Sequence, residues 1–233
     1  DAPDYINAMI NLSIIIHEEG NTEKAIKFLE KIKAGYNDYY NADLLNMTLA
    51  SFYFSKNIDI KKTFEYLQKA ILINPYKEEY YLFMMHAYKQ LNDFGNLEKT
   101  AFDGLENLGI KNSINILNYI GIEYFKRNDL RNSELVFKST LTEYPNNHTA
   151  YFFLGNIYAL QHRYQDALTY YTMSILLTNE NGEYYFKRSA VYLLLNNYKK
   201  AKEDMENSLK KGFNIDVIFK NEIEKIKNSG EGK

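Results

Sequence analysis

An interval of 34 residues recurs along the chain, and it constrains the fold more than any other feature. The segment from His148 to Asn181 aligns without gaps with the segment from Gly182 to Ile215, 34 residues each. Units of this length cannot bury a core alone and are stable only when neighbours stack. Similar units continue upstream, so that six of them start near residues 6, 44, 78, 114, 148 and 182.

Each unit contains two amphipathic stretches of about 12 residues, separated by a polar turn such as residues 195–197. Small side chains such as Gly155 and Ala167 stand where two helices would cross closely. Pro75 and Pro145 cannot continue a helix and therefore end the second stretch of their units. With only 3 prolines and 11 glycines in 233 residues, many strands and tight turns are disfavoured. The sequence predicts an all-α chain of antiparallel helical hairpins.

The pattern resembles the tetratricopeptide repeat family. That family has a large residue at position 4 of its repeat, Leu-Gly at 7 and 8, Tyr at 11, Ala at 20 and 27, and Pro at 32. The unit from His148 matches best, through Leu154, Gly155, Tyr158, Ala167 and Tyr171. The resemblance covers Ile6 to about Ile215 and implies a right-handed α-solenoid.

The unit that starts at Glu78 departs from the family pattern. It has Met85 at position 8, Leu97 at position 20 and Gly104 at position 27, so we expect this unit to pack irregularly. Two intervals exceed 34 residues, and we expect longer loops near Gly35 to Asp43 and near Gly109 to Ser113.

The whole chain, residues 1–233, is predicted to form one superhelical domain that ends in a capping helix. A terminal repeat needs a cap whose outer side is polar. Residues 215–228 carry an apolar stripe opposite charged side chains, and we expect this segment to be that cap. The apolar residues of the stripe are Ile215, Ile218, Phe219, Ile223 and Ile226.

Charge and cysteine content exclude several classes of partner. A net charge of -2 gives no basic patch, so we expect no nucleic-acid binding. The chain has no cysteine, which removes disulfides and thiolate metal sites. The longest apolar stretch, Ile6 to Ile16, is shorter than the roughly 20 residues of a membrane span.

Catalytic groups do not form a recognisable constellation, so we expect a protein that is not an enzyme and has no metal or cofactor. No histidine pair has the spacing that places two ligands on one helical face, and no glycine-rich phosphate loop occurs. We therefore expect the histidines to be solvated or capping residues. They are His17, His86, His148 and His162.

The resemblance implies that positions 2, 5, 9 and 12 of each first helix line a concave groove. The candidate groove residues are Phe52, Leu82, His86, Asn118, Ile122, Phe125, Phe152, Asn156 and Phe186. Family members that capture chaperone tails use a clamp of Lys, Asn and Arg. Ile122, Phe153 and Glu183 occupy three of those slots here, which argues against this function. Either the groove is an open trough, or the chain itself covers Phe152 and its neighbours.

The predicted function is a scaffold that binds a peptide or helix of another protein in this groove. Two alternatives remain open: a helper or sensor domain of a larger regulator or enzyme, and a lipid-anchored envelope assembly protein. Because the chain begins at Asp1, we expect an excised segment. Its location is either cytoplasmic or periplasmic and envelope-associated, and its source is expected to be bacterial. The sequence does not indicate the partner or the oligomeric state.

Overall fold

Every regular element that the structure describes is helical. The computed structural model describes residues 2–35, 41–55 and 58–214, and these ranges contain no strand. The helices are α1 (Ala2–Glu18), α2 (Thr22–Gly35), α3 (Ala42–Ser55), α4 (Ile60–Ile73), α5 (Glu78–Gln90), α6 (Phe94–Leu108), the 3-10 helix η1 (Ile110–Asn112), α7 (Ile114–Lys126), α8 (Leu130–Glu143), α9 (His148–Leu160), α10 (Tyr164–Leu177), α11 (Gly182–Leu194) and α12 (Tyr198–Lys210). The predicted all-α class is confirmed.

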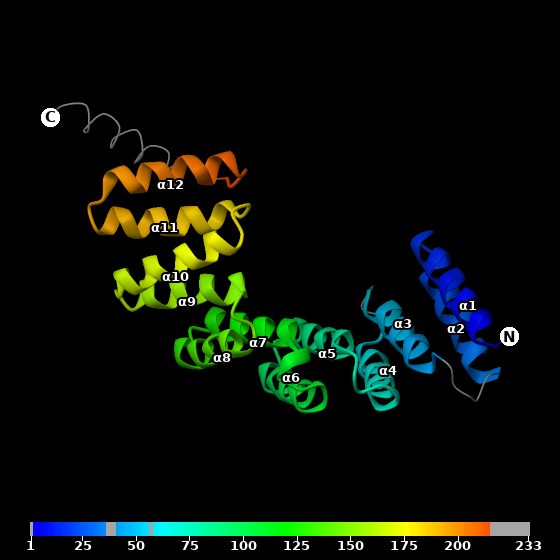
Figure 1. Cartoon of the computed structure of the whole chain (residues 1–233). Coiled ribbons are helices and arrows are strands. Elements are labelled where there is room, and N and C mark those ends of the chain that lie inside the picture. The colour runs from blue at the N-terminus through cyan, green and yellow to red at the C-terminus, as the bar shows by residue number, and fades with distance from the viewer. Residues whose placement is uncertain (1, 36–40, 56–57, 215–233) are drawn as a thin grey trace. The chain divides into compact units, whose positions relative to one another are not determined.

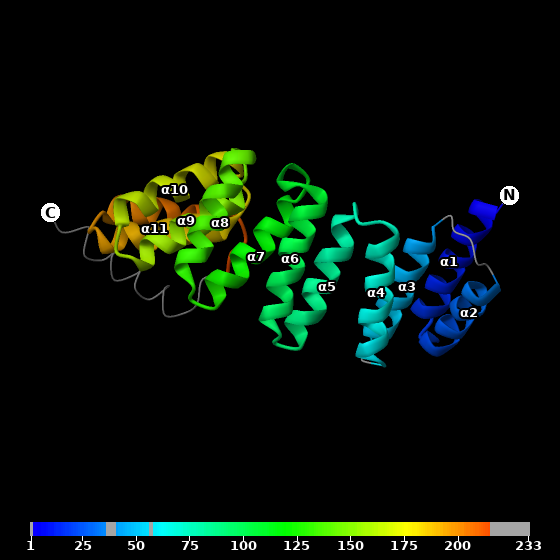
Figure 2. The same cartoon turned by 90° about the horizontal axis from the view of Figure 1, so that it is seen from below.

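The chain divides into two compact units, Asp1–Ile116 and Leu117–Lys233. In the first unit α1 pairs with α2, α3 with α4, and α5 with α6. In the second unit α9 pairs with α10 and α11 with α12, and Ser133 of α8 donates a hydrogen bond of 2.9 Å to the Gly121 carbonyl of α7. Figures 1 and 2 show the two helices of each hairpin side by side. The single continuous superhelix stays a prediction.

Each unit has its own hydrophobic core between its hairpins. In the first unit the core contains Leu29, Leu49 and Leu67, one from each of three consecutive helices. In the second unit it is more aromatic and includes Phe137 and Tyr171. The core residues lie at the apolar positions of the amphipathic stretches, because burying these faces is what holds stacked hairpins together.

Glycines allow the two helices of a hairpin to approach closely in the second unit. A Cβ atom on Gly121 would lie 2.7 Å from the ring of Phe137, and one on Gly155 would lie 2.6 Å from the ring of Tyr171. Any larger side chain at these two positions would overlap an aromatic ring. The small residues predicted for the helix crossing therefore do have a packing role.

The turn inside a hairpin uses one residue in the left-handed backbone region. Gly20, Asn92, Asn128, His162 and Asn196 occupy the same position in five units, and all five have a positive φ. Asparagine and glycine adopt this conformation at little cost. An Asp or Asn then caps the second helix of several hairpins, as the Asp93 carboxylate does by accepting the backbone N–H of Asn96.

The two predicted longer loops differ in how far the structure describes them. Residues 109–113 contain η1, which fills the extra length between α6 and α7. Residues 36–40 of the other loop lie outside the described residues, as does the predicted capping helix 215–228.

Candidate functional site

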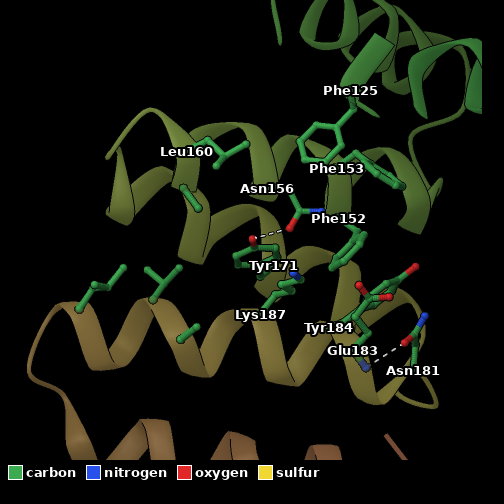
Figure 3. A pocket seen from close by; sticks show the side chains of 14 residues that line it. Phe125, Phe152, Phe153, Asn156, Leu160, Tyr171, Asn181, Glu183, Tyr184 and Lys187 are labelled. Carbon is green, nitrogen blue, oxygen red and sulfur yellow. Dashed lines mark hydrogen bonds between the residues drawn. The ribbon is translucent and has the colours of Figure 1, made fainter. Parts of the chain in front are cut away.

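A groove of about 490 Å³ lies in the second unit, between α9 and α11, with Phe125 of α7 at one end (Figure 3). Most of its lining side chains come from α9 and α11, and Tyr171 of α10 reaches it from behind. This volume is in the range of sites that accept small ligands or a few peptide side chains. The groove therefore combines parts of three first helices of successive repeats.

Stacked aromatic rings form the floor of the groove. Phe152 is only 5% exposed and stacks on Tyr184 with ring centroids 4.4 Å apart. The Tyr184 hydroxyl hydrogen-bonds to His148 at 2.8 Å. Burial raises the pKa of the Tyr171 and Tyr184 hydroxyls, so both stay neutral at ordinary pH. The floor is consequently aromatic and uncharged.

Asn156 is the polar group that the floor presents. Its Oδ1 accepts a hydrogen bond of 2.8 Å from the Tyr171 hydroxyl, as Figure 3 shows. That bond fixes the orientation of the amide, because only the oxygen can accept from a hydroxyl donor. The Nδ2 group of Asn156 donates to no other described residue and remains able to bind a ligand carbonyl.

The rim of the groove is apolar and open to solvent. Leu160 at the end of α9 is 56% exposed, and Leu194 at the end of α11 is 60% exposed. Phe125 and Phe153 meet edge to face at the other end, with centroids 5.3 Å apart. Apolar side chains that water can reach therefore border the groove at both ends.

Two opposite charges stand on α11 beside this rim. Glu183 and Lys187 both line the groove, and neither has an ion-pair partner among the described residues. They lie at i and i+4 on one face of the helix. The Glu183 backbone N–H is already used, since it donates to the capping side chain of Asn181 at 3.0 Å. Their side chains can therefore add charge complementarity to a bound segment.

The structure brings three of the predicted groove residues together: Phe125, Phe152 and Asn156. Two further candidates lie in the same unit without lining the groove. Asn118 accepts a hydrogen bond of 2.9 Å from Asn147, and Ile122 packs against the core. The burial of Phe152 agrees with the alternative in which the chain covers this ring itself.

On α9 and α11 the groove uses positions that the predicted stripe did not contain. Phe153 and Leu160 of α9, and Lys187 and Leu194 of α11, occupy positions 6 and 13 of their repeats. Phe186, the candidate at position 5 of α11, does not line the groove but lies beside Phe213, with centroids 5.2 Å apart. The signal available in the sequence was the apolar Leu at position 13 of two successive units.

The remaining candidates, from the first unit, have different surroundings. Phe52 is buried and stacks on His17, with centroids 4.6 Å apart. His86 is exposed and lies edge-on to Phe54, and Leu82 is half-buried. A partner-binding role for these three residues stays a prediction.

Neither metal ligation nor membrane insertion is supported by the described helices. Within residues 2–35, 41–55 and 58–214, no group of three or more His, Asp or Glu side chains could hold a metal ion. In the same ranges, no helix has the length and apolar character that crossing a bilayer requires.

A family model described as tetratricopeptide repeat matches residues 182–210, which are α11 and α12. The hairpins upstream have the same helix order, and those that begin with α7 and α9 also keep the 34-residue spacing and the close glycine crossing. Residues 182–210 therefore form a tetratricopeptide repeat, and the described chain has the helical-hairpin fold of such repeats. The groove described above is lined mainly by the first helices α9 and α11 of two successive hairpins, and its role in binding a partner stays a prediction.

Several solved structures share the fold. PilF of Pseudomonas aeruginosa is similar over 88% of this chain and 90% of its own, with 13% identity and a TM-score of 0.65. PilW, a widely conserved type IV pilus biogenesis factor, is similar over 85% and 89%, with 16% identity and a TM-score of 0.60. A tetratricopeptide repeat protein of Parabacteroides merdae is similar over 97% and 85%, with 18% identity and a TM-score of 0.55. None of the curated proteins compared with the chain matches it.

Proposed function

We propose that this protein is a scaffold that binds a peptide segment of another protein in the groove between α9 and α11. Tetratricopeptide repeat folds serve in general as scaffolds for protein–protein interaction. The observation that carries the proposal is the pair of exposed leucines, Leu160 and Leu194, that border an aromatic floor. Water leaves such a surface favourably when an apolar side chain enters.

The groove favours a segment that is apolar on one side and that offers free backbone carbonyls. Asn156 Nδ2 would donate to one of these carbonyls, because its Oδ1 is held by Tyr171. Apolar side chains of the segment would lie between Leu160 and Leu194. Glu183 and Lys187 would pair with a basic and an acidic residue of the segment, which would fix its direction.

Peptide selection can test the proposal before the partner is identified. Random 12-residue peptides (about 40 Å when extended) are displayed and selected on the wild-type protein, and the winners are measured by fluorescence anisotropy. Leu160→Asp should weaken binding of the winners by about tenfold or more, because it places a charge on an apolar contact. The melting temperature should change little, since this side chain is half-exposed already.

Leu135→Asp is the matched control. Leu135 lies on α8 in the same unit, is 58% exposed and does not line the groove. This variant should bind the selected peptides within about twofold of wild type. If the selected peptides bound the Leu160→Asp and Leu135→Asp proteins equally well, the groove would not be the binding site.

The two alternative functions stay predictions. The likeness to PilW is a likeness of fold at 16% identity, so it does not by itself favour envelope assembly. A helper or sensor role in a larger polypeptide is compatible with the same groove. That the protein is not an enzyme also remains a prediction, although scaffolds of this fold are typically non-enzymatic.

A further inference from the structure

A second cleft, of about 470 Å³, lies in the first unit among α4, α5 and α6. Side chains of the second helices α4 and α6 form its walls, and side chains of α5 form its floor. Figure 2 shows these three helices in succession. The groove proposed to bind a peptide is lined mainly by first helices of the second unit instead. The cleft is therefore a separate site that shares no residue with that groove.

The cleft is open because α6 has a small residue where an equivalent helix has an aromatic ring. Thr100 of α6 and Tyr170 of α10 both hold position 23 of their repeats. In the second unit the Tyr170 ring packs against Tyr151 and Tyr158, with ring centroids 6.1 and 5.1 Å away. Threonine has no ring, so the corresponding space in the first unit is left open.

Two tyrosines of α5 form the floor of this space. Tyr81 and Tyr88 stand at the positions of the two tyrosines that pack against Tyr170 in the second unit, and both line the cleft. The Tyr81 hydroxyl donates 3.0 Å to the Pro75 carbonyl, and the Tyr88 ring stacks on Phe64. Burial raises the pKa of both hydroxyls, so they stay neutral at ordinary pH. This floor offers an aromatic ligand the contacts that Tyr170 makes.

Charged and amide groups on the walls surround the floor. Lys99 and Asp103 of α6 line the cleft, and neither has an ion-pair partner within residues 2–35, 41–55 and 58–214. They stand one turn apart with Lys before Asp, which is the weaker order for opposite charges on a helix. Gln68 of α4 lines the other wall. One cation, one anion and one amide are thus available to a ligand.

The charges of the two walls disfavour ligands that carry a single sign of charge. The helix α4 carries three lysines and one glutamate, whereas α6 carries one lysine, two glutamates and one aspartate. The positive excess of α4 equals the negative excess of α6, so neither a phosphate ester nor a polyamine is favoured. A zwitterion is favoured, because it can place opposite charges beside Lys99 and Asp103.

We propose that this cleft binds a free aromatic amino acid. Its ring lies against Tyr81 and Tyr88, in the space that Tyr170 fills in the second unit. Its carboxylate accepts a hydrogen bond from Lys99, and its ammonium group donates one to Asp103. Both charged groups of an amino acid belong to one carbon atom, which suits two side chains one helical turn apart. The volume of the cleft is in the range of small-ligand sites.

The probe is L-tryptophan, because the chain contains no tryptophan and an indole can be excited apart from the 22 tyrosines. Titrating the protein into L-tryptophan should give a saturable rise in fluorescence anisotropy, with a Kd below about 1 mM. N-acetyl-L-tryptophanamide has the same ring without either charge and should bind about fivefold more weakly. Equal binding of the two probes would overturn the proposal and assign the cleft to an aromatic side chain of a protein.

A change at Thr100 tests whether the ring enters the cleft. Thr100→Tyr supplies the ring that fills the equivalent space in the second unit, so it should weaken binding of L-tryptophan by about tenfold or more. Thr169→Tyr, at an exposed position of α10, is the matched control and should stay within about twofold of wild type. A folded Thr100→Tyr protein that binds L-tryptophan as wild type does would overturn the proposal.

Charge variants keep the test decisive if Thr100→Tyr melts well below wild type. Lys99→Met and Asp103→Asn, both at exposed positions, should each weaken binding of L-tryptophan by about threefold and leave binding of N-acetyl-L-tryptophanamide unchanged. Lys61→Met, an exposed lysine of α4 that does not line the cleft, is the control and should change neither. The proposal is wrong if L-tryptophan shows no saturable binding, or if both charge variants bind it as tightly as wild type.

Discussion

The hairpins α5/α6 and α9/α10 reach the same fold with side-chain bulk on opposite helices. In α9/α10 the first helix has Gly155 at the crossing, and the second helix has Tyr171, whose ring lies against it. At the equivalent positions α5 has Met85 and α6 has Ala101, both fully buried. The α5/α6 unit, which departs from the family pattern, therefore forms the same hairpin with the large side chain on its first helix instead of its second.

The two hairpins differ again where their first helix meets the preceding one. Tyr88 of α5 and Tyr158 of α9 hold the same position in the repeat. The Tyr88 ring stacks on Phe64, with centroids 4.3 Å apart, whereas the Tyr158 hydroxyl donates 3.0 Å to Glu134. Phe64 and Glu134 are themselves equivalent residues of α4 and α8. An apolar contact in one unit is thus a hydrogen-bonded, charged contact in the other.

Total volume and satisfied polar groups, more than fixed residue types, thus define a hairpin of this protein. Cores generally accept substitutions that preserve volume and pattern. The residues that form the groove are less interchangeable, because they depend on specific side chains. In the α9/α10 hairpin the Tyr171 hydroxyl fixes the amide of Asn156, which faces the groove.

The largest expected effect comes from removing the ring of Tyr171. Tyr171→Ala should lower the free energy of unfolding by about 3–5 kcal/mol, because it leaves a cavity at the helix crossing. It should also release Asn156 and weaken peptide binding in the groove. Urea denaturation followed by circular dichroism measures the first effect. A loss below about 1 kcal/mol would mean that the crossing does not depend on this ring.

Placing the large side chain on the first helix, as in α5/α6, should restore part of the stability that Tyr171→Ala removes. Gly155→Met alone should cost about 1–3 kcal/mol, since its Cβ would meet the Tyr171 ring. Combined with Tyr171→Ala it should instead fill the cavity, so that the double variant is more stable than the sum of the two changes by about 1 kcal/mol or more. Gly95→Met, at an exposed position in the first turn of α6, controls for the helix propensity gained by replacing glycine. Strict additivity would contradict the exchange of volumes.

A smaller effect is expected at the Glu134 contact, and it should depend on pH. Hydrogen bonds from Lys138 and Tyr158 hold the pKa of Glu134 below its ordinary value of 4.5. A carboxyl whose pKa is lowered by folding stabilises the protein above its unfolded pKa, and this stabilisation is lost as pH falls through the folded pKa. Glu134→Gln should therefore cost about 0.5 kcal/mol at neutral pH, because solvent screens the pair, and progressively less below about pH 4.5.

Thermal melts between pH 3 and pH 7 (from about 1.5 units below to about 2.5 units above the ordinary glutamate pKa) measure this difference. Glu143 is an exposed carboxylate on the same helix, so Glu143→Gln is the control. Its melting temperature should differ from that of wild type by less than that of Glu134→Gln at every pH. The Tyr88 contact on Phe64 has no carboxylate, so Phe64→Leu should change stability by an amount that does not vary with pH across this range. If the difference in stability between wild type and Glu134→Gln stayed constant down to pH 3, the charge of Glu134 would not contribute to stability.

Most of the fold could be predicted from the sequence, because stacked hairpins repeat their pattern. The starts expected at 78, 114, 148 and 182 coincide with the first residues of α5, α7, α9 and α11. The exchange between Met85 and Ala101 was visible only as a departure from the pattern. Its compensation could be recognised only with both helices in place, because complementary volumes belong to residue pairs that are distant in the sequence.

The groove could be predicted less well than the fold. The expected stripe placed Phe186 in the groove, whereas Lys187, one residue further, lines it. Consecutive residues of a helix point about 100° apart, so which of the two faces the groove depends on how α11 is rotated about its axis. That rotation depends on neighbours such as Phe213, which holds Phe186 from the other side. The sequence periodicity alone does not contain this information.

The smallest effect concerns the turns of the same two hairpins. Asn92 between α5 and α6 has a φ of 55°, and His162 between α9 and α10 has a φ of 60°. Asparagine adopts this left-handed conformation more readily than most residues, because its short side chain can hydrogen-bond locally. His162→Asn should therefore raise the free energy of unfolding, measured by urea denaturation, by about 0.3 kcal/mol. A destabilised His162→Asn protein would show that the hydrogen bond of 2.9 Å between His162 and Tyr164 matters more to this turn than its backbone conformation.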